Sequence, residues 1–282
     1  MTIVGSTLAV GSIAVFNLAN NIQSFPLGIF AVSFAIAAFP TMSEFNRRKK
    51  QFIEIISLTI RQILFFILPA SALLIVLRAQ AVRVILGSGL FDWEDTVLTL
   101  ETLSLFAFSL FAQGLILVLI RAFYAQHDSK TPFYTGLISV LANIILAIIF
   151  IEQLGVAGLA LAFSLSNIFN LVLLFLILHS RLGKLDGQKI TFSTIKILVA
   201  TFMLALTAQA IKYPIEQMMG LETFIDVTVQ AAAAASGGLI VYILICWLLR
   251  SEELGIFINS LKKKFLKQPV IAEEIIEKEK LI

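Results

Sequence analysis

The chain has 282 residues, of which 59% are hydrophobic and only 14% are charged. Soluble domains carry about 25% charged residues, so this composition and the mean hydropathy of +0.97 exclude a soluble globular protein. The net charge is only +3, and the single cysteine excludes an intrachain disulfide. The sequence therefore predicts an all-α integral membrane protein, because a helix satisfies its own backbone hydrogen bonds in lipid.

Seven apolar segments follow one another along the chain. Crossing a bilayer takes about 20 mostly apolar residues, and each segment is long enough. They lie at 12–43, 51–77, 96–125, 132–151, 155–179, 191–211 and 227–249. The sequence therefore predicts seven transmembrane helices.

The first segment carries polar side chains in its first half, at positions i, i+3, i+4 and i+7. These are Asn17, Asn20, Asn21 and Ser24. They share one face of a helix, and Gln23 lies beside them. Because amides in lipid need partners or a wet cavity, this face is either a polar seam against another helix or the wall of a transport cavity. Pro26 removes a backbone hydrogen bond and is a hinge candidate.

Glu101 is the only acidic residue well inside an apolar segment. It is a candidate for ion coupling, since ionisable groups in spans often serve ion pathways. The alternative is a carboxylate that finds a local partner near the membrane interface. Both interpretations stay open at this point.

The basic residues predict the orientation. If the seven segments alternate in direction, all of the 21 lysines and arginines except Arg78, Arg83 and Lys212 fall on one side. The positive-inside rule places that side, with the C-terminus, in the cytoplasm. Met1 then lies outside without a basic anchor, so we expect a further segment upstream. Apolar residues at helical spacing after Arg250 predict an interfacial helix on the anionic leaflet or a solvated basic anchor.

Motifs for catalysis are absent from the sequence. It contains no GxxxxGK[ST] phosphate loop, no HExxH, no GxSxG and no Cys/His metal spacing, and His127 and His179 stand alone. We therefore expect no enzyme activity, no catalytic residues, no metal or cofactor, and no nucleic-acid partner.

Two stretches resemble the MurJ/MviN family. They are GSIAVFNLANNIQSFPLGIFAVSFAIAAFPTMS at 11–43 and LIRAFYAQHDSKTP at 119–132. The first is similar to the family's eighth membrane helix and the second to its cytoplasmic LxxxFYAxxDTKTP segment. Pro69 and GSGLFDWEDT at 87–96 resemble the ninth helix and the turn after it. The order and spacing of these pieces agree with the family.

The resemblance implies a fold and a function. The family is the lipid II flippase group of the MOP (MATE-like) superfamily, with fourteen helices in two lobes and an additional helix pair. By that match residues 1–10 end the seventh helix, 11–180 form the C-terminal lobe, 181–250 the additional pair and 251–282 a cytoplasmic tail. The implied protein is a multi-pass flippase of the bacterial cytoplasmic membrane. It would move undecaprenyl-linked peptidoglycan precursor across the membrane by alternating access. Its expected partners are this precursor, membrane lipids and an N-terminal lobe that the sequence lacks.

The resemblance also implies roles for particular residues. The polar residues of the first helix, Gln23 included, would face the substrate cavity. A cytoplasmic gate loop would contain Arg121, Asp128 and Lys130, although a simple helix-connecting turn with capping charges is the alternative. The family's Ala-Asp-Arg, whose arginine is thought to meet the substrate pyrophosphate, is replaced here by Ala19, Asn20 and Asn21. A neutral amide lacks the bidentate charge of arginine. An ion-coupled polysaccharide or drug exporter of the same superfamily and a non-transporting scaffold are therefore kept as alternatives.

Overall fold

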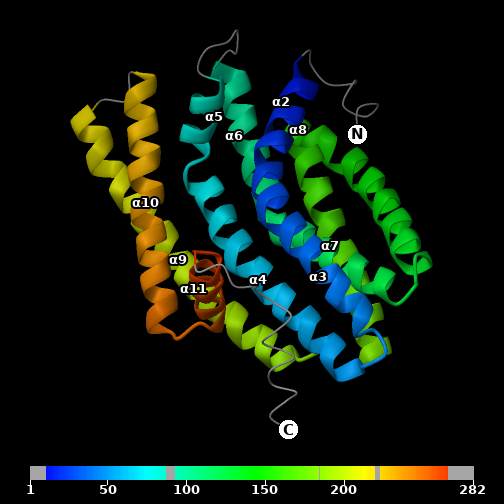
Figure 1. Ribbon diagram of the computed structural model, residues 1–282. Coiled ribbons are helices and arrows are strands. Elements are labelled where there is room, and N and C mark those ends of the chain that lie inside the picture. The colour runs from blue at the N-terminus through cyan, green and yellow to red at the C-terminus, as the bar shows by residue number, and fades with distance from the viewer. Residues whose placement is uncertain (1–10, 87–92, 184, 220–222, 266–282) are drawn as a thin grey trace.

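The computed structural model describes residues 11–86, 93–183, 185–219 and 223–265, and every regular element within them is a helix (Figure 1). The elements are α2 (Ser12–Pro26), η1 (Leu27–Val32), α3 (Ser33–Glu44), α4 (Lys49–Val76), α5 (Arg78–Leu86), α6 (Trp93–Phe108), α7 (Leu110–Ala125), α8 (Lys130–Leu182), α9 (Gly187–Met219), α10 (Phe224–Leu248) and α11 (Glu252–Phe265). The expected all-helical class is confirmed for the described residues. The helix end predicted at residues 1–10 lies outside them, as do residues 266–282 of the predicted tail.

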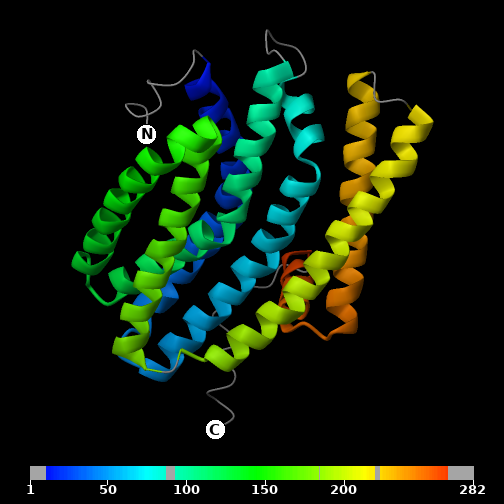
Figure 2. The same ribbon diagram turned by 180° about the vertical axis from the view of Figure 1, so that it is seen from behind.

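Five helices of the described part are long and apolar enough to cross a membrane, or up to six if the bent pair α6 and α7 is one span. The predicted count of seven is therefore not confirmed. The predicted spans 132–151 and 155–179 both lie in α8, which has 53 residues. The two halves of α8 join at Gly155 and lie side by side (Figures 1 and 2).

The reversal within α8 depends on two glycines. Gly155 has φ 54° and ψ −128°, a conformation that only glycine adopts without strain. At Gly158 a Cβ atom would lie 2.4 Å from the carbonyl oxygen of Phe150, so the two arms can approach only without that atom. Asn143 then joins the arms by donating a hydrogen bond to the Ser166 hydroxyl over 2.9 Å.

The bundle has α8 at one edge and the pair α9–α10 at the other, with α4 crossing between them (Figures 1 and 2). The largest buried cluster gathers around α4 and includes Phe52, Ile56, Ile63, Leu119 and Phe123. Large apolar side chains remain exposed along α8, α9 and α10. Exposed apolar surface of this extent is expected of helices that face lipid.

A proline in α4 explains how α10 is attached. Pro69 has no N–H, so the carbonyl oxygen of Phe65, one turn earlier, loses its helical partner. The hydroxyl of Tyr242, on α10, donates to that oxygen over 2.7 Å in a buried site. The bond satisfies an acceptor that would otherwise stay unpaired in an apolar environment.

A buried ion cluster attaches α11 to α4 and α9. We define it as Arg61, Ser193, Ser251 and Glu253, all at most 8% exposed. Arg61 Nη1 lies 2.7 Å from Glu253 Oε1, which also accepts from the Ser193 hydroxyl, while Ser251 donates to Oε2. Burial alone would raise the pKa of Glu253. The hydrogen bonds from Ser251 and Ser193, together with Arg61, outweigh it, so this pKa lies below its ordinary value.

The turn into α11 places Glu253 in that cluster. Arg250 has φ 49° after the end of α10, its N–H donates to the carbonyl of Trp247, and the Ser251 N–H donates to the carbonyl of Cys246. This is the Schellman pattern that closes a helix. The helix predicted after Arg250 is therefore present as α11. It packs against α4, where the ring centroids of Phe257 and Phe66 lie 5.2 Å apart in a T-shaped arrangement.

Candidate functional site

The candidate site is the polar face of α2, which we define as Asn17, Asn20, Asn21 and Ser24. Asn17, Asn21 and Ser24 are exposed and Asn20 is half-buried. The side chains of Asn17 and Asn21 form no hydrogen bond to another described residue. An amide without a partner is costly in hydrocarbon, so this is a face that needs water, ligand or protein beside it.

Gln23 does not lie on the polar face. It is fully buried between α2 and α7, where its Oε1 accepts a hydrogen bond from Gln113 Nε2 over 3.0 Å. Its own Nε2 donates to Asn20 Oδ1 over 2.9 Å. Gln113 was not singled out from the sequence, although a lone amide in an otherwise apolar helix was a usable signal.

Pro26 stands where α2 gives way to a π-helix. The six-residue η1, Leu27–Val32, follows it directly, and α3 continues the same span. Because Pro26 cannot donate to the preceding turn, the wider turns of η1 absorb the irregularity. Single π-turns occur often at functional sites. The hinge assigned to Pro26 stays a prediction.

Glu101 lies on α6 with an exposed side chain. It forms no ion pair with another described residue. No group of three or more His, Cys, Asp or Glu side chains in the described part could hold a metal ion. The assignment of Glu101 to ion coupling stays a prediction.

The loop after α7 is a compact polar cluster. Its turn is closed at His127, with φ 58°, by Schellman bonds from His127 to Tyr124 and from Asp128 to Phe123. Asp128 accepts hydrogen bonds from the hydroxyl and backbone amide of Thr131 and pairs with Arg181 from the far end of α8. The Thr131 bonds, with Arg181, hold the pKa of Asp128 well below its ordinary range.

Two other residues of the predicted gate loop are placed differently. The guanidinium of Arg121 lies 6.0 Å from the centre of the Phe39 ring, which links α7 to α3. Lys130 is exposed and contributes only its backbone N–H, which donates to Asp128. Asn46 donates to the Ala125 carbonyl, so the loops after α3 and α7 meet at one end of the bundle.

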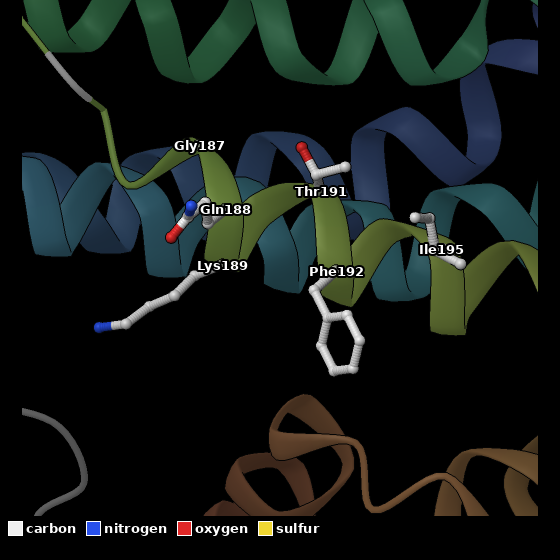
Figure 3. A pocket seen from close by; sticks show the side chains of 6 residues that line it. All are labelled: Gly187, Gln188, Lys189, Thr191, Phe192 and Ile195. Atoms are coloured by element: carbon white, nitrogen blue, oxygen red, sulfur yellow. The ribbon is translucent and has the colours of Figure 1, made fainter.

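A pocket of about 660 Å³ lies at the start of α9 (Figure 3). It is lined by Gly187, Gln188, Lys189, Thr191, Phe192 and Ile195. All of these belong to about two turns of one helix, and Phe192 is 65% exposed. Binding sites gather polar groups from several elements, so this pocket lacks the features of a second site.

Comparison with known proteins gives consistent matches. The family described as lipid II flippase MurJ matches residues 1–225. A probable lipid II flippase MurJ of Thermotoga maritima is 34% identical over 177 residues, which cover 61% of this chain and 36% of the relative. One from Rhizobium tropici is 27% identical over 257 residues, which cover 90% and 48%. These matches favour the flippase over the exporter and the scaffold.

A solved structure shows the same fold. It is a lipid II flippase MurJ in the inward closed conformation, with a TM-score of 0.69 at 24% identity, over 94% of this chain and 50% of that one. The chain therefore spans half or less of the length of these relatives.

Long apolar helices, a bent helix pair and a polar face exposed within the first span are features of a multi-pass membrane protein. Its sequence identifies the group within that class. The chain belongs to the MurJ family, whose members are multi-pass proteins of the inner membrane.

Proposed function

We propose that this chain provides one side of the translocation pathway of a lipid II flippase. The single observation that carries the proposal is the polar face of α2, exposed within an apolar span, in a chain matched by the MurJ family over residues 1–225. The polar head group of an undecaprenyl-linked precursor would contact this face while its tail stays in lipid. Alternating access would then carry the head group outward.

A second helical lobe is the partner that this proposal requires. Asn17, Asn21 and Ser24 are exposed, and each polar group left in hydrocarbon costs several kcal/mol. A second lobe would enclose the face in a wet cavity. In two-lobe transporters the substrate site lies between the lobes, so access changes when one lobe rocks against the other.

The proposed orientation places the loops after α3 and α7 in the cytoplasm, with seven crossings if α8 contributes two. The Asn46 bond to Ala125 and the Asp128–Arg181 pair support a common end for these loops, and their basic residues favour the cytoplasmic side. There the cluster around Asp128 would act as the inner gate. The variants Asn46→Cys and Ser129→Cys should then resist impermeant thiol reagents added to intact cells. Rapid labelling of both cysteines would show that these loops face the outside and would contradict the proposed orientation.

Complementation tests the proposed function. In cells depleted of their lipid II flippase, we expect residues 1–282 alone to give no growth. Co-expression with the N-terminal seven-helix half of a relative should restore growth, and the same pair carrying Asn21→Leu should not. Growth supported by this chain alone would contradict the two-lobe proposal. Failure of the pair despite normal membrane levels, measured by immunoblot, would contradict the flippase assignment.

A further inference from the structure

A continuous series of hydrogen bonds runs from the break between α6 and α7 to the polar face of α2. We name it the donor series, and its members are Ser109, Gln113, Gln23 and Asn20. The hydroxyl of Ser109 contacts the carbonyl of Phe106 over 3.1 Å. Gln113 Nε2 lies 3.0 Å from Ser109 Oγ and 3.0 Å from Gln23 Oε1. Gln23 Nε2 then reaches Asn20 Oδ1.

The direction of the series is fixed at its buried end. A backbone carbonyl can only accept, and at the bend of 42° between α6 and α7 the Phe106 carbonyl accepts from both the backbone N–H and the hydroxyl of Ser109. Ser109 therefore donates to Phe106, and its oxygen is left to accept from Gln113. Because the Ser109 N–H bonds to Phe106, the Leu105 carbonyl accepts instead from the Ser164 hydroxyl, whose oxygen lies 3.0 Å from that of Ser109.

The same direction passes through both glutamines. Gln113 must present its NH₂ group, because one N–H meets Ser109 and the other meets Gln23. Gln23 therefore accepts at Oε1 and donates from Nε2, and Asn20 accepts at Oδ1. What remains of the Asn20 amide is its Nδ2, which bonds to no described residue.

The other groups of the polar face lack this constraint. The side-chain amides of Asn17 and Asn21 bond to no described residue, so either the oxygen or the NH₂ group of each can turn toward a ligand. Ser24 donates its hydroxyl to the Asn20 carbonyl over 2.6 Å and is left as an acceptor. Asn20 is thus the one amide of the face whose orientation is set by the protein.

We propose that Gln113 is a positioning residue that, through Gln23, fixes Asn20 as an N–H donor and so selects a phosphate-bearing head group on the polar face of α2. The inference rests on the proposed function and deepens it. A donor held in place stabilises an anion without having to reorient.

Binding to the full chain, co-expressed with the N-terminal seven-helix half of a relative and reconstituted in nanodiscs, tests this role. The probes are undecaprenyl pyrophosphate and, as its neutral counterpart, undecaprenol. We expect wild type to prefer the pyrophosphate, and Gln113→Met, which keeps side-chain length but cannot donate, to lose about tenfold of that preference. Gln80→Met is the matched control, because Gln80 donates to Gln230 over 2.7 Å in another buried amide pair. It should lower thermal stability similarly and leave the preference unchanged.

Gln113→Glu separates orientation from packing, since it is isosteric. At about pH 5 the protonated acid can still donate to Gln23, whereas at about pH 9 the carboxylate can only accept and reverses the series. The variant should therefore keep the pyrophosphate preference at the lower pH and lose it at the higher, against wild type at each pH. Unchanged preference in both Gln113 variants, with wild type selective, would overturn the positioning role alone. No preference in wild type would overturn it together with the proposed head group.

Discussion

The polar face of α2 and the buried ion cluster around Arg61 are both polar regions in an apolar bundle, yet they are built in opposite ways. In the cluster, Glu253 is 3% exposed and both its oxygens accept hydrogen bonds. On the polar face, Asn17 and Asn21 are exposed and their side chains bond to no described residue. Polar groups that the fold satisfies hold helices together, whereas groups that it leaves unpaired await a ligand or a partner.

The largest effect on stability is expected from Arg61→Met. The substitution leaves Glu253 buried without its cation, and breaking a buried pair from one side costs about 3–5 kcal/mol. Thermal unfolding in detergent, followed by circular dichroism, should show the loss. The double variant Arg61→Met/Glu253→Met should recover much of it, since neither charge is then buried. A single variant as stable as wild type would contradict the role of the cluster.

A smaller loss is expected from Tyr242→Phe. The change deletes only the hydroxyl and leaves the Phe65 carbonyl, already without a helical donor because of Pro69, unpaired in a buried site. We expect about 1–2 kcal/mol, measured in the same unfolding assay. Phe in place of Tyr213, which is 67% exposed, is the control and should be neutral. Equal effects at the two positions would show that the hydroxyl bond does not hold α10 to α4.

Asp128→Ala should destabilise the loop by about 1 kcal/mol at neutral pH, because the carboxylate caps the first turn of α8. Thr131 and Arg181 lower the pKa of Asp128, so its contribution is present above about pH 4, the unfolded value, and is lost as the pH falls further. The difference between wild type and variant should therefore shrink below about pH 4. If the stability difference between wild type and Asp128→Ala instead grew as the pH fell, it would contradict a lowered pKa of Asp128 in the folded state. Asp128→Asn, which keeps one acceptor oxygen, should lose less at neutral pH.

The smallest effect on stability is expected on the polar face itself. Asn21→Leu removes no bond between described residues and should change unfolding free energy by less than about 0.5 kcal/mol. It should nevertheless abolish complementation by the two-half pair, whereas Asn21→Arg should preserve it if the substrate is a lipid pyrophosphate. A large loss of stability with retained growth would assign the face to packing.

The sequence predicted the features that depend on neighbouring residues. Helical spacing was enough to gather Asn17, Asn21 and Ser24 on one exposed face, and hydropathy was enough for the all-helical membrane class. Helical spacing was not enough to place Gln23, because its burial depends on α7 lying against the first span. Gly114 permits α7 to approach η1, which follows α2 in the same span, because a Cβ atom at Gly114 would lie 3.3 Å from the Cβ atom of Ala31.

Features formed by residues far apart in the chain could not be predicted. Arg61 and Glu253 are separated by 192 positions, and helical periodicity carries no information over that distance. The turn that brings them together has Arg250 at positive φ, where glycine is the usual signal. The turn at His127 could not be predicted for the same reason, because a residue other than glycine adopts positive φ there. The sequence separates 132–151 from 155–179 near Gly155, but in the structure both arms belong to the single helix α8, so five or six candidate spans are found in the described part rather than seven.

Cysteine reactivity tests the central claim, that the polar face of α2 borders a wet cavity, most directly. The chain carrying Cys246→Ser is co-expressed with the N-terminal half, and Asn21→Cys is compared with Phe25→Cys and Ile29→Cys. Phe25 and Ile29 are 71% and 47% exposed on the same span, but their apolar side chains belong in lipid. Thiols react as thiolates, which need water. A charged reagent should therefore modify Asn21→Cys at least about tenfold faster than either control, and equal rates at all three positions would contradict the account.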